Sequence, residues 1–424
     1  MGTRQSVFPN GADEMALLDG IVTAGADASG TAGLVARSLE AVRQHLGMEV
    51  AYISEFVGND SVFRVVDAPG LEAMIKPGDS RSLDDVYCRH ILAGRLPELI
   101  PDTSVLPLAA GMPITRAVPI GSHVSVPIRL EDGSVYGMFC CLSPQTNPTL
   151  NARDLQVMRA FADIAAGEIR RERQSEVAAE ARRAGIRRVI DDSLFAIHFQ
   201  PIWDFRHRAP VGFECLTRFS PVPVRSPDKW FAEAAALGLG LDLELAAIRA
   251  CVQAAAGLPD DVYVAVNAAA ETLLSPGLAA ALEGVDGRRF VLELTEHAAV
   301  ADYPSLLATI EAYRARGFRL AIDDAGAGYS GLQHILRLKP DIIKLDMALT
   351  RDVDTDPARR ALAAALIHFA RETGCQILAE GIETDEEYAT LKRLGVAKGQ
   401  GYHLGRPMVL ADALALCAPV GQVA

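Results

Sequence analysis

The stretch "RLAIDD" (Arg319–Asp324) is a short apolar run that ends in two adjacent carboxylates. Similar runs recur between Phe195 and Gln400, and helix-prone segments such as 302–316 and 357–373 lie between them. This alternation is typical of repeated β–α units. Repetition of such units over residues 191–424 predicts an α/β fold, a (β/α)8 TIM-like barrel, with a doubly wound open sheet as the structural alternative.

Polar or charged side chains stand at the end of nearly every run. In a barrel the carboxyl ends of all strands meet at one face, where active sites lie. A single acidic residue after a strand is most often a helix N-cap, but several converging carboxylates repel one another unless cations lie between them. Carboxylate and amide oxygens favour Mg²⁺ or Mn²⁺. The strand-end residues are Glu214, Asn267, Glu293, Asp323, Asp324, Lys344, Asp346, Glu380 and Gln400.

Six spaced motifs cover this half of the chain. They are "ECL" (214–216), "ELTE" (293–296), "DDAGAGYSGL" (323–332), "KLD" (344–346), "AEGIE" (379–383) and "QGYHLGRP" (400–407). In content and order they resemble the motifs of the EAL family of cyclic-di-GMP phosphodiesterases. The resemblance implies hydrolysis of one phosphodiester bond of cyclic-di-GMP to linear pGpG, with two Mg²⁺ or Mn²⁺ ions per active site.

The resemblance also assigns roles to individual side chains. The implied metal ligands are Glu214, Asn267, Glu293, Asp323, Asp324 and Glu380. Lys344 would orient or deprotonate the attacking water or offset developing charge, with a salt bridge to a carboxylate as its plain alternative. The other implied catalytic residues are Glu380, Glu383 and Gln400. Substrate would contact Gln200, Leu216 and Arg218, where a surface salt bridge is the alternative for Arg218, and Glu296 would support the glycine loop.

Three positions depart from the family pattern. Cys215 replaces an alanine, a change expected to leave the neighbouring carboxylate untouched, while Ala325 and Ala327 replace a phenylalanine and a threonine in the glycine loop. The loop changes bear on regulation and basal rate more than on the chemistry. An active phosphodiesterase is therefore the favoured hypothesis, ahead of a catalytically weak cyclic-di-GMP receptor and a dimerisation scaffold. The sequence has no GGDEF-like stretch, so no cyclase activity is expected.

The N-terminal part has a different pattern. Helical periodicity from Thr31 to Leu46 precedes two predicted hairpins, which turn at 58–60 and at 132–133. The stretch "YCRHILAGRLPELIPDT" (87–103) reads as a short helix and a strand. This layout predicts a small α+β domain and resembles a GAF domain, which implies an unidentified small-molecule ligand or a dimerisation role. The predicted organisation is a mobile segment 1–27, a GAF-like sensory domain 28–170, a helical linker 171–190 and an EAL domain 191–424.

Two features of this part have alternative interpretations. Cys88 and His90 suggest an anchored chromophore or haem, but a buried cysteine and a surface or capping histidine are favoured. Heptad spacing links Leu155, Met158, Ala162, Ala165 and Ile169. This seam predicts either a parallel dimer helix that carries a signal, or an amphipathic helix packed on its own domain.

The bulk properties limit the class of protein. The chain has 424 residues, a formal charge of −13 and seven cysteines without a CxxC pair. The negative charge argues against unspecific binding to a nucleic-acid polymer, and the cysteines suggest neither disulfide framework nor thiolate zinc site. We find neither a membrane-length apolar run nor a secretory signal. The expectation is a cytoplasmic signalling protein, a homodimer without membrane contact.

Overall fold

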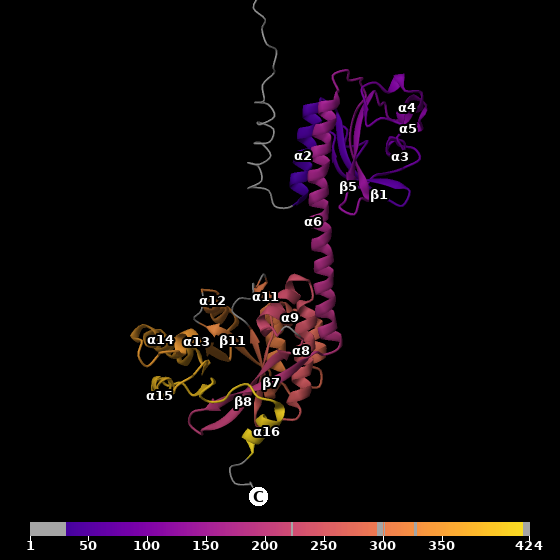
Figure 1. The fold of residues 1–424 in the computed structure, drawn as a ribbon. Coiled ribbons are helices and arrows are strands. Elements are labelled where there is room, and N and C mark those ends of the chain that lie inside the picture. Colours follow the sequence, from indigo (N-terminus) through magenta and orange to yellow (C-terminus); the bar gives the residue numbers. More distant parts are fainter. Residues whose placement is uncertain (1–30, 222–223, 295–299, 301, 326–328, 419–424) are drawn as a thin grey trace, which may run out of the picture. The chain divides into compact units, whose positions relative to one another are not determined.

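The computed structural model describes residues 31–221, 224–294, 300, 302–325 and 329–418, but not the side chains of 31–32, 324–325 and 329–332. Contacts divide the chain into two compact units, 1–178 and 179–424, which are described separately (Figure 1). The segment 1–27 predicted to be mobile, together with Glu296 and Ala327, lies outside the described residues.

The first unit is an antiparallel sheet covered by helices on both faces. Its strands follow the order β3-β2-β1-β6-β5-β4. The predicted hairpins are β1–β2 and β5–β6, and the strand β4 was also expected, whereas the edge strand β3 was not. The elements are α2 (Thr31–Leu46), β1 (Val50–Val57), β2 (Asp60–Asp67), β3 (Ser80–Ser82), α3 (Tyr87–Leu92), β4 (Leu99–Ile100), η2 (Thr103–Val105), α4 (Pro107–Gly111), α5 (Pro113–Ala117), β5 (Ser122–Arg129), β6 (Val135–Ser143) and α6 (Ala152–Asp191).

The two faces of this sheet carry separate hydrophobic cores. Helices α2 and α6 lie side by side on one face, and α3, α4 and α5 lie on the other (Figure 1). Successive residues of a strand point to opposite faces. Accordingly Phe139 and Cys141 of β6 belong to the core under α2 and α6, while Met138, Cys140 and Leu142 belong to the core under α3.

Helix α6 uses its heptad seam to pack against its own sheet. Met158, Ala162 and Ala165 are buried in the core beneath α2 and α6, and Leu155 and Ile169 border that core. The interpretation as an amphipathic helix packed on its own domain is therefore confirmed for the seam. In the described part of the chain, no helix combines the length and apolar character needed to cross a membrane.

The second unit is a closed eight-stranded barrel, as predicted. The strand order around the barrel is β10-β11-β12-β13-β14-β7-β8-β9. Its elements are β7 (Phe195–Asp204), β8 (Ala209–Phe219), α7 (Pro227–Ala236), α8 (Gly240–Ala255), β9 (Tyr263–Asn267), α9 (Ala270–Leu274), α10 (Pro276–Ala281), η3 (Gly287–Arg289), β10 (Phe290–Leu294), α11 (Tyr303–Ala315), β11 (Arg319–Ala325), α12 (Tyr329–Leu338), β12 (Ile342–Leu345), α13 (Met347–Thr350), α14 (Pro357–Thr373), β13 (Gln376–Ala379), α15 (Asp385–Leu394), β14 (Lys398–Gly399) and α16 (Leu410–Cys417).

One strand of the barrel breaks the regular β–α repeat. Strand β7 is antiparallel to both of its neighbours, β8 and β14, whereas the other adjacent pairs are parallel. Only four residues, 205–208, join β7 to β8. That connection is too short for a helical crossover, so the two strands form a hairpin. The antiparallel start was not predicted, because the expectation treated every run as part of a β–α unit.

The centre of the first unit's sheet depends on a glycine. Gly137 of β6 is paired with Glu55 of β1 and with Ile128 of β5, and a Cβ atom there would overlap the backbone oxygen of Ser54. We expect Gly137→Ala to lower the free energy of unfolding of this unit by about 1–3 kcal/mol through overpacking. Chemical denaturation followed by circular dichroism measures the change.

Gly111→Ala is the matched control. Gly111 ends helix α4, and a Cβ atom there would meet nothing within 4 Å. Because alanine is a better helix former than glycine, this control should be neutral or slightly stabilising. Equal effects of the two substitutions would contradict the assignment of Gly137 to a crowded strand centre.

Candidate functional site

The candidate site is a layer of polar side chains stacked above an apolar layer inside the barrel. The apolar layer includes Ala265, Val291, Ala321, Ile342 and Leu378, each from a different strand. Because side chains two positions apart in a strand share a face, the next interior position on each strand lies one layer higher. These positions are Asn267, Glu293, Asp323, Lys344 and Glu380. The strand period therefore directs five of the predicted residues to the same end of the barrel.

A buried ammonium group lies at the centre of this layer. The Lys344 side chain is 1% exposed, and its Nζ lies among the carboxylates of three strands and of Glu380, the residue directly after β13. The separations are 2.9 Å to Glu293 Oε2, 2.9 Å to Asp323 Oδ1, 2.9 Å to Glu380 Oε1 and 3.7 Å to Glu214 Oε2. The salt-bridge alternative for Lys344 is thus what the structure shows. A buried charge of this kind is tolerated only when it is paired and hydrogen-bonded.

Two amides complete the layer. Gln400, which is 4% exposed, donates from Nε2 to Glu214 Oε2 at 2.5 Å and to Glu380 Oε1 at 2.8 Å. Asn267 donates from Nδ2 to Glu214 Oε1 at 3.3 Å. The Oε1 atom of Gln400 is buried and has no hydrogen-bond partner. The structure therefore brings Glu214, Asn267, Glu293, Asp323, Lys344, Glu380 and Gln400 into one connected cluster.

Burial and mutual repulsion shift the acid–base properties of this cluster. Burial raises the pKa of Glu293 to about 8. The charge of Lys344 opposes this shift, and the charges of Glu214 and Asp323 add to it. Burial likewise raises the pKa of Glu380 well above its usual value. For Lys344 burial alone would lower the pKa, but the surrounding carboxylates, Asp323 foremost, raise it well above that of a free lysine. The direction of this shift favours the ammonium form of Lys344 among these carboxylates.

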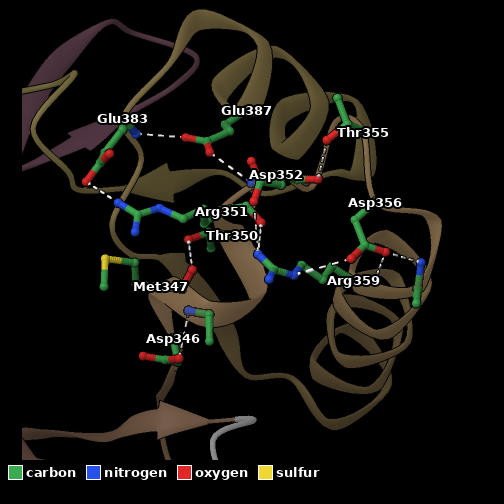
Figure 2. Close-up of polar contacts among 12 residues, drawn as sticks. Asp346, Met347, Thr350, Arg351, Asp352, Thr355, Asp356, Arg359, Glu383 and Glu387 are labelled. Carbon is green, nitrogen blue, oxygen red and sulfur yellow. Dashed lines mark hydrogen bonds and ion pairs between the residues drawn. The ribbon is translucent and has the colours of Figure 1, made fainter.

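A second polar network surrounds Glu383, next to β13. Figure 2 shows the Glu383 carboxylate turned toward Arg351, with which it forms an ion pair of 2.6 Å. The Glu387 carboxylate accepts hydrogen bonds from the backbone N–H groups of Asp352, Glu383 and Thr384. Glu383 is thus fixed by neighbours outside the carboxylate cluster, and the structure shows it bound to Arg351 rather than to that cluster.

The backbone of Glu380 is tied to the same network. Thr350, at the end of α13, is fully buried and donates from Oγ1 to the Glu380 backbone carbonyl. The Glu380 N–H donates to the Leu345 carbonyl at 3.1 Å. Both contacts come from the chain around β12, which also carries Lys344. Consequently the carboxylate of Glu380 and the ammonium of Lys344 are held by a common segment.

The predicted substrate residues lie on the β7–β8 hairpin. Gln200 pairs across the hairpin with Glu214, and its Nε2 donates to the Gly405 carbonyl at 3.4 Å. Leu216 and Arg218 follow Glu214 at two-residue intervals, so the three side chains share a face of β8. The Arg218 guanidinium donates to the Thr217 carbonyl at 3.1 Å, and within the described residues it has no ion pair.

Other predicted positions lie outside the cluster or outside the described side chains. Asp346 is the N-cap of α13, where its side chain accepts from Ala348 N–H at 2.7 Å, so it is a cap and does not join the cluster. The side chains of Asp324 and Ala325 are not described, although both residues lie in β11. Cys215 points away from the cluster, into the core between strands and helices.

Sequence reasoning missed three residues that support Glu380 and Glu383, two through backbone hydrogen bonds and one through an ion pair. Arg351, Thr350 and Glu387 were not singled out, because none stands at a strand end. A signal for Glu387 was present in the sequence: Thr384 and Glu387 have the spacing of a capping box, and the structure contains that box. The Arg351–Glu383 ion pair had no comparable local signal, since the two residues are distant along the chain.

Fold and site together define a barrel with an acidic centre at the carboxyl ends of its strands, preceded by a small α+β unit. The EAL domain family model matches residues 179–407, and the GAF domain model matches residues 30–170. The chain belongs to the EAL domain family, and its N-terminal unit is a GAF domain.

Named relatives match the barrel half. The "Probable cyclic di-GMP phosphodiesterase PdeA" of Escherichia coli is 30% identical over 54% of this chain and 32% of its own length. "Cyclic di-GMP phosphodiesterase PdeR" of the same organism is 29% identical over 53% of this chain and 35% of its own length. The matches thus span about a third of the length of these curated relatives.

A solved structure matches most of the chain in fold. It is described as "Structure of EAL Enzyme Bd1971 - cAMP and cyclic-di-GMP bound form", with a TM-score of 0.53 and 18% identity over 88% of this chain and 93% of that one. At this identity the likeness concerns the fold alone.

The donor set fits hard divalent cations. The interior layer offers the carboxylates of Glu214, Glu293, Asp323 and Glu380 and the unpartnered Oε1 of Gln400, which are oxygen ligands. Within the described residues, no three acidic, histidine or cysteine side chains already form a metal-binding group. Lys344 forms ion pairs with these same carboxylates.

The raised pKa of Glu293 predicts a pH-dependent stability of the barrel. A carboxyl whose pKa is about 8 in the folded protein and 4.5 when free binds its proton more tightly in the folded state. Its contribution to stability is therefore largest below the free pKa and falls as the pH rises through the folded pKa. With a chelator present, Glu293→Gln should reduce the loss of stability between about pH 5 and about pH 8 by on the order of 1–3 kcal/mol.

Tryptophan fluorescence in urea measures this effect, because both tryptophans, Trp203 and Trp230, belong to the barrel unit. Glu271→Gln, at an exposed position on α9, is the matched control and should keep the wild-type slope. An unchanged slope in Glu293→Gln would show that this carboxyl is not the buried group described above.

Proposed function

We propose that the barrel hydrolyses one of the two phosphodiester bonds of cyclic-di-GMP and releases linear pGpG. The observation that carries this proposal is the buried cluster of four carboxylates around Lys344 at the carboxyl ends of the strands, in a chain of the EAL domain family. The names of the relatives support the same substrate. A neutral binding site would gain nothing from so many buried like charges, which weaken the fold unless they have a chemical role.

The proposal includes two divalent cations, Mg²⁺ or Mn²⁺. The residues that would hold them are Glu214, Asn267, Glu293, Asp323, Asp324 and Glu380, and the cations would polarise the phosphoryl oxygens and favour deprotonation of the attacking water. A Lewis acid is needed because the substrate's phosphodiester groups are anionic and resist an approaching nucleophile.

The chain's own residues supply the proton transfers and the positioning. In our proposal Glu380, whose pKa is raised by burial, accepts a proton from the attacking water as its oxygen bonds to phosphorus. The bond between phosphorus and the 3′ oxygen breaks, that oxygen takes up a proton from solvent to become a hydroxyl, and Glu380 returns its proton to solvent. Lys344, which remains an ammonium, offsets the negative charge that develops on the phosphoryl oxygens. We therefore propose the charge-offset role for Lys344, alongside its salt bridges to the carboxylates.

The remaining residues hold these groups and the substrate. Gln400 bridges Glu214 and Glu380 and fixes their orientation. Gln200, Leu216 and Arg218 would hold the dinucleotide along the β7–β8 hairpin, where the guanidinium of Arg218 can bind a phosphate. Glu383 would contribute through the water network near Glu380. Glu296 keeps its proposed role in supporting the glycine loop.

The rest of the chain is proposed to regulate this reaction. We retain the division into a GAF-like sensory domain (28–170), a helical linker (171–190) and an EAL domain (191–424), working as a cytoplasmic homodimer. Control of the barrel by the N-terminal domain is supported by the continuous helix α6, which contributes to both compact units.

Loss of the first carboxylate should abolish turnover. Glu214→Gln removes one charge from the cluster but keeps the hydrogen-bonding shape, so we expect the rate to fall at least about a hundredfold. Cyclic-di-GMP is incubated with the full chain and Mg²⁺ or Mn²⁺, and linear product is measured by nucleotide chromatography. Glu271→Gln is the exposed control and should keep the rate.

Two results would contradict the proposal. Full activity of Glu214→Gln would overturn the assignment of the site. Binding of cyclic-di-GMP by the wild type without product at any metal concentration would leave the catalytically weak receptor as the function.

Arg351 tests the second network. Arg351→Met leaves Glu383 without its ion-pair partner, and because outer partners orient reacting groups, we expect a roughly ten- to hundredfold lower kcat with little change in KM. Arg351→Lys retains a cation and should recover most of the rate. Arg371→Met, at an exposed arginine on α14, is the control. Wild-type kcat in Arg351→Met would show that Glu383 needs no such support.

A further inference from the structure

The GAF domain contains a cavity of about 250 Å³ on the α3–α5 side of its sheet. Most of the lining is aliphatic or aromatic, with Val50, Phe63, Ile120 and Leu142 among the buried walls and Leu71 and Met74 nearer the surface. An apolar cavity of about 150 Å³ holds benzene, so this one has room for a larger ring or a short hydrocarbon chain. Its walls offer few partners to water, which favours an apolar occupant.

One side chain that lines the cavity, His123, carries a polar atom without a hydrogen-bond partner, although the side chain also interacts with Cys140. His123 lines the cavity, is 2% exposed, and has a buried Nδ1 atom without a hydrogen bond. Its ring contacts Tyr87 edge-on at 4.9 Å, but the Tyr87 hydroxyl is already hydrogen-bonded to Thr115 Oγ1 at 2.6 Å. An unsatisfied buried polar atom costs on the order of 1–3 kcal/mol, and a ligand that supplies the missing hydrogen bond would recover that cost.

A cation stands at the edge of the same cavity. Arg81, on the edge strand β3, is exposed and lines the cavity, and within the described residues it has no ion-pair partner. A guanidinium without an ion-pair partner beside an apolar cavity is a local binding point for an anion, although the chain as a whole has a net charge of −13. The apolar walls, His123 and Arg81 together describe an amphiphilic ligand.

We propose that this cavity binds a small apolar acid, in which a ring or short hydrocarbon chain carries one carboxylate or similar anionic group. The hydrocarbon body lies against the buried walls, Arg81 opposes the negative charge, and His123 Nδ1 hydrogen-bonds to a polar atom of the ligand. Cys88 and His90 are not among the described lining residues, so the ligand is held without a covalent or axial bond to them. The proposal does not depend on the hydrolytic activity of the barrel.

Matched probes test the ligand class on the full chain. Octanoate, octan-1-ol and octylamine share one body, and phenylacetate, 2-phenylethanol and 2-phenylethylamine share another. In isothermal titration calorimetry we expect at least one acid to bind saturably, and at least about tenfold more tightly than its alcohol and its amine. Val118→Trp, which adds bulk to the lining, should abolish that binding.

Charge and hydrogen-bonding variants complete the test. Arg81→Gln should remove the preference for the acid, whereas Arg116→Gln, at an exposed arginine of α5 outside the lining, should keep it. His123→Phe should weaken binding while retaining a ring, and circular dichroism shows whether it folds. The proposal is overturned if neither acid binds, if the alcohol or amine binds equally well, or if Val118→Trp or Arg81→Gln binds as the wild type does.

Discussion

The contact between the Lys344 ammonium and the surrounding carboxylates is the interaction on which the barrel's functional end depends. Three strands and the residue that follows β13 supply the carboxylates, and β12 supplies the lysine. None of these charges would be stable alone in a buried layer, because removal of one member leaves an uncompensated charge. The charges can pair only if the strands keep their register, so a shift of one strand would leave buried charges unpaired. Burial and the repulsion between neighbouring carboxylates raise the pKa of Glu293 and Glu380 within this cluster, while the charge of Lys344 opposes the shift.

The two-residue period of the strands explains why the polar side chains of the site and the apolar side chains of the outer core occupy different faces. Interior positions alternate with positions that face the helices, so Glu214 enters the polar layer while Cys215 enters the outer core. Burial and contact with Cys251 raise the pKa of the Cys215 thiol, which keeps it neutral beside the carboxylates. The substitution from the family's alanine is thus accommodated by the packing of the outer layer. Asp346 is also kept out of the polar layer, because it lies after the end of β12 and caps helix α13.

Much of the fold and the centre of the site could be predicted from the sequence, for identifiable physical reasons. Each barrel strand is a short apolar run with a polar end, so a period of two was enough to bring Glu293, Lys344 and Glu380 together. The antiparallel direction of β7 was not predicted, because an apolar run fits a parallel or an antiparallel strand equally well. Only the four-residue connection 205–208 indicates the antiparallel pairing. Arg351 was not predicted, because it supports Glu383 through an ion pair between residues far apart in the sequence. The seam of α6 stayed ambiguous because a heptad pattern does not identify the surface that covers it.

The sheet of the GAF domain carries a different hydrophobic core on each face, and the apolar cavity lies on the side of α3 and α5. Cys141 of β6 lies under α6, with its Sγ 3.8 Å from Met158 Sδ, whereas Cys140 and Leu142 lie on the side of the cavity. Contact with Cys140 and burial raise the pKa of Cys88, so this thiol is a neutral part of the wall behind the cavity, as favoured from the sequence. A rigid strand cannot move one side chain without its neighbours, because interiors are close-packed. Strand β6 therefore contributes side chains both to the core beside the cavity and to the core that contains the seam of α6.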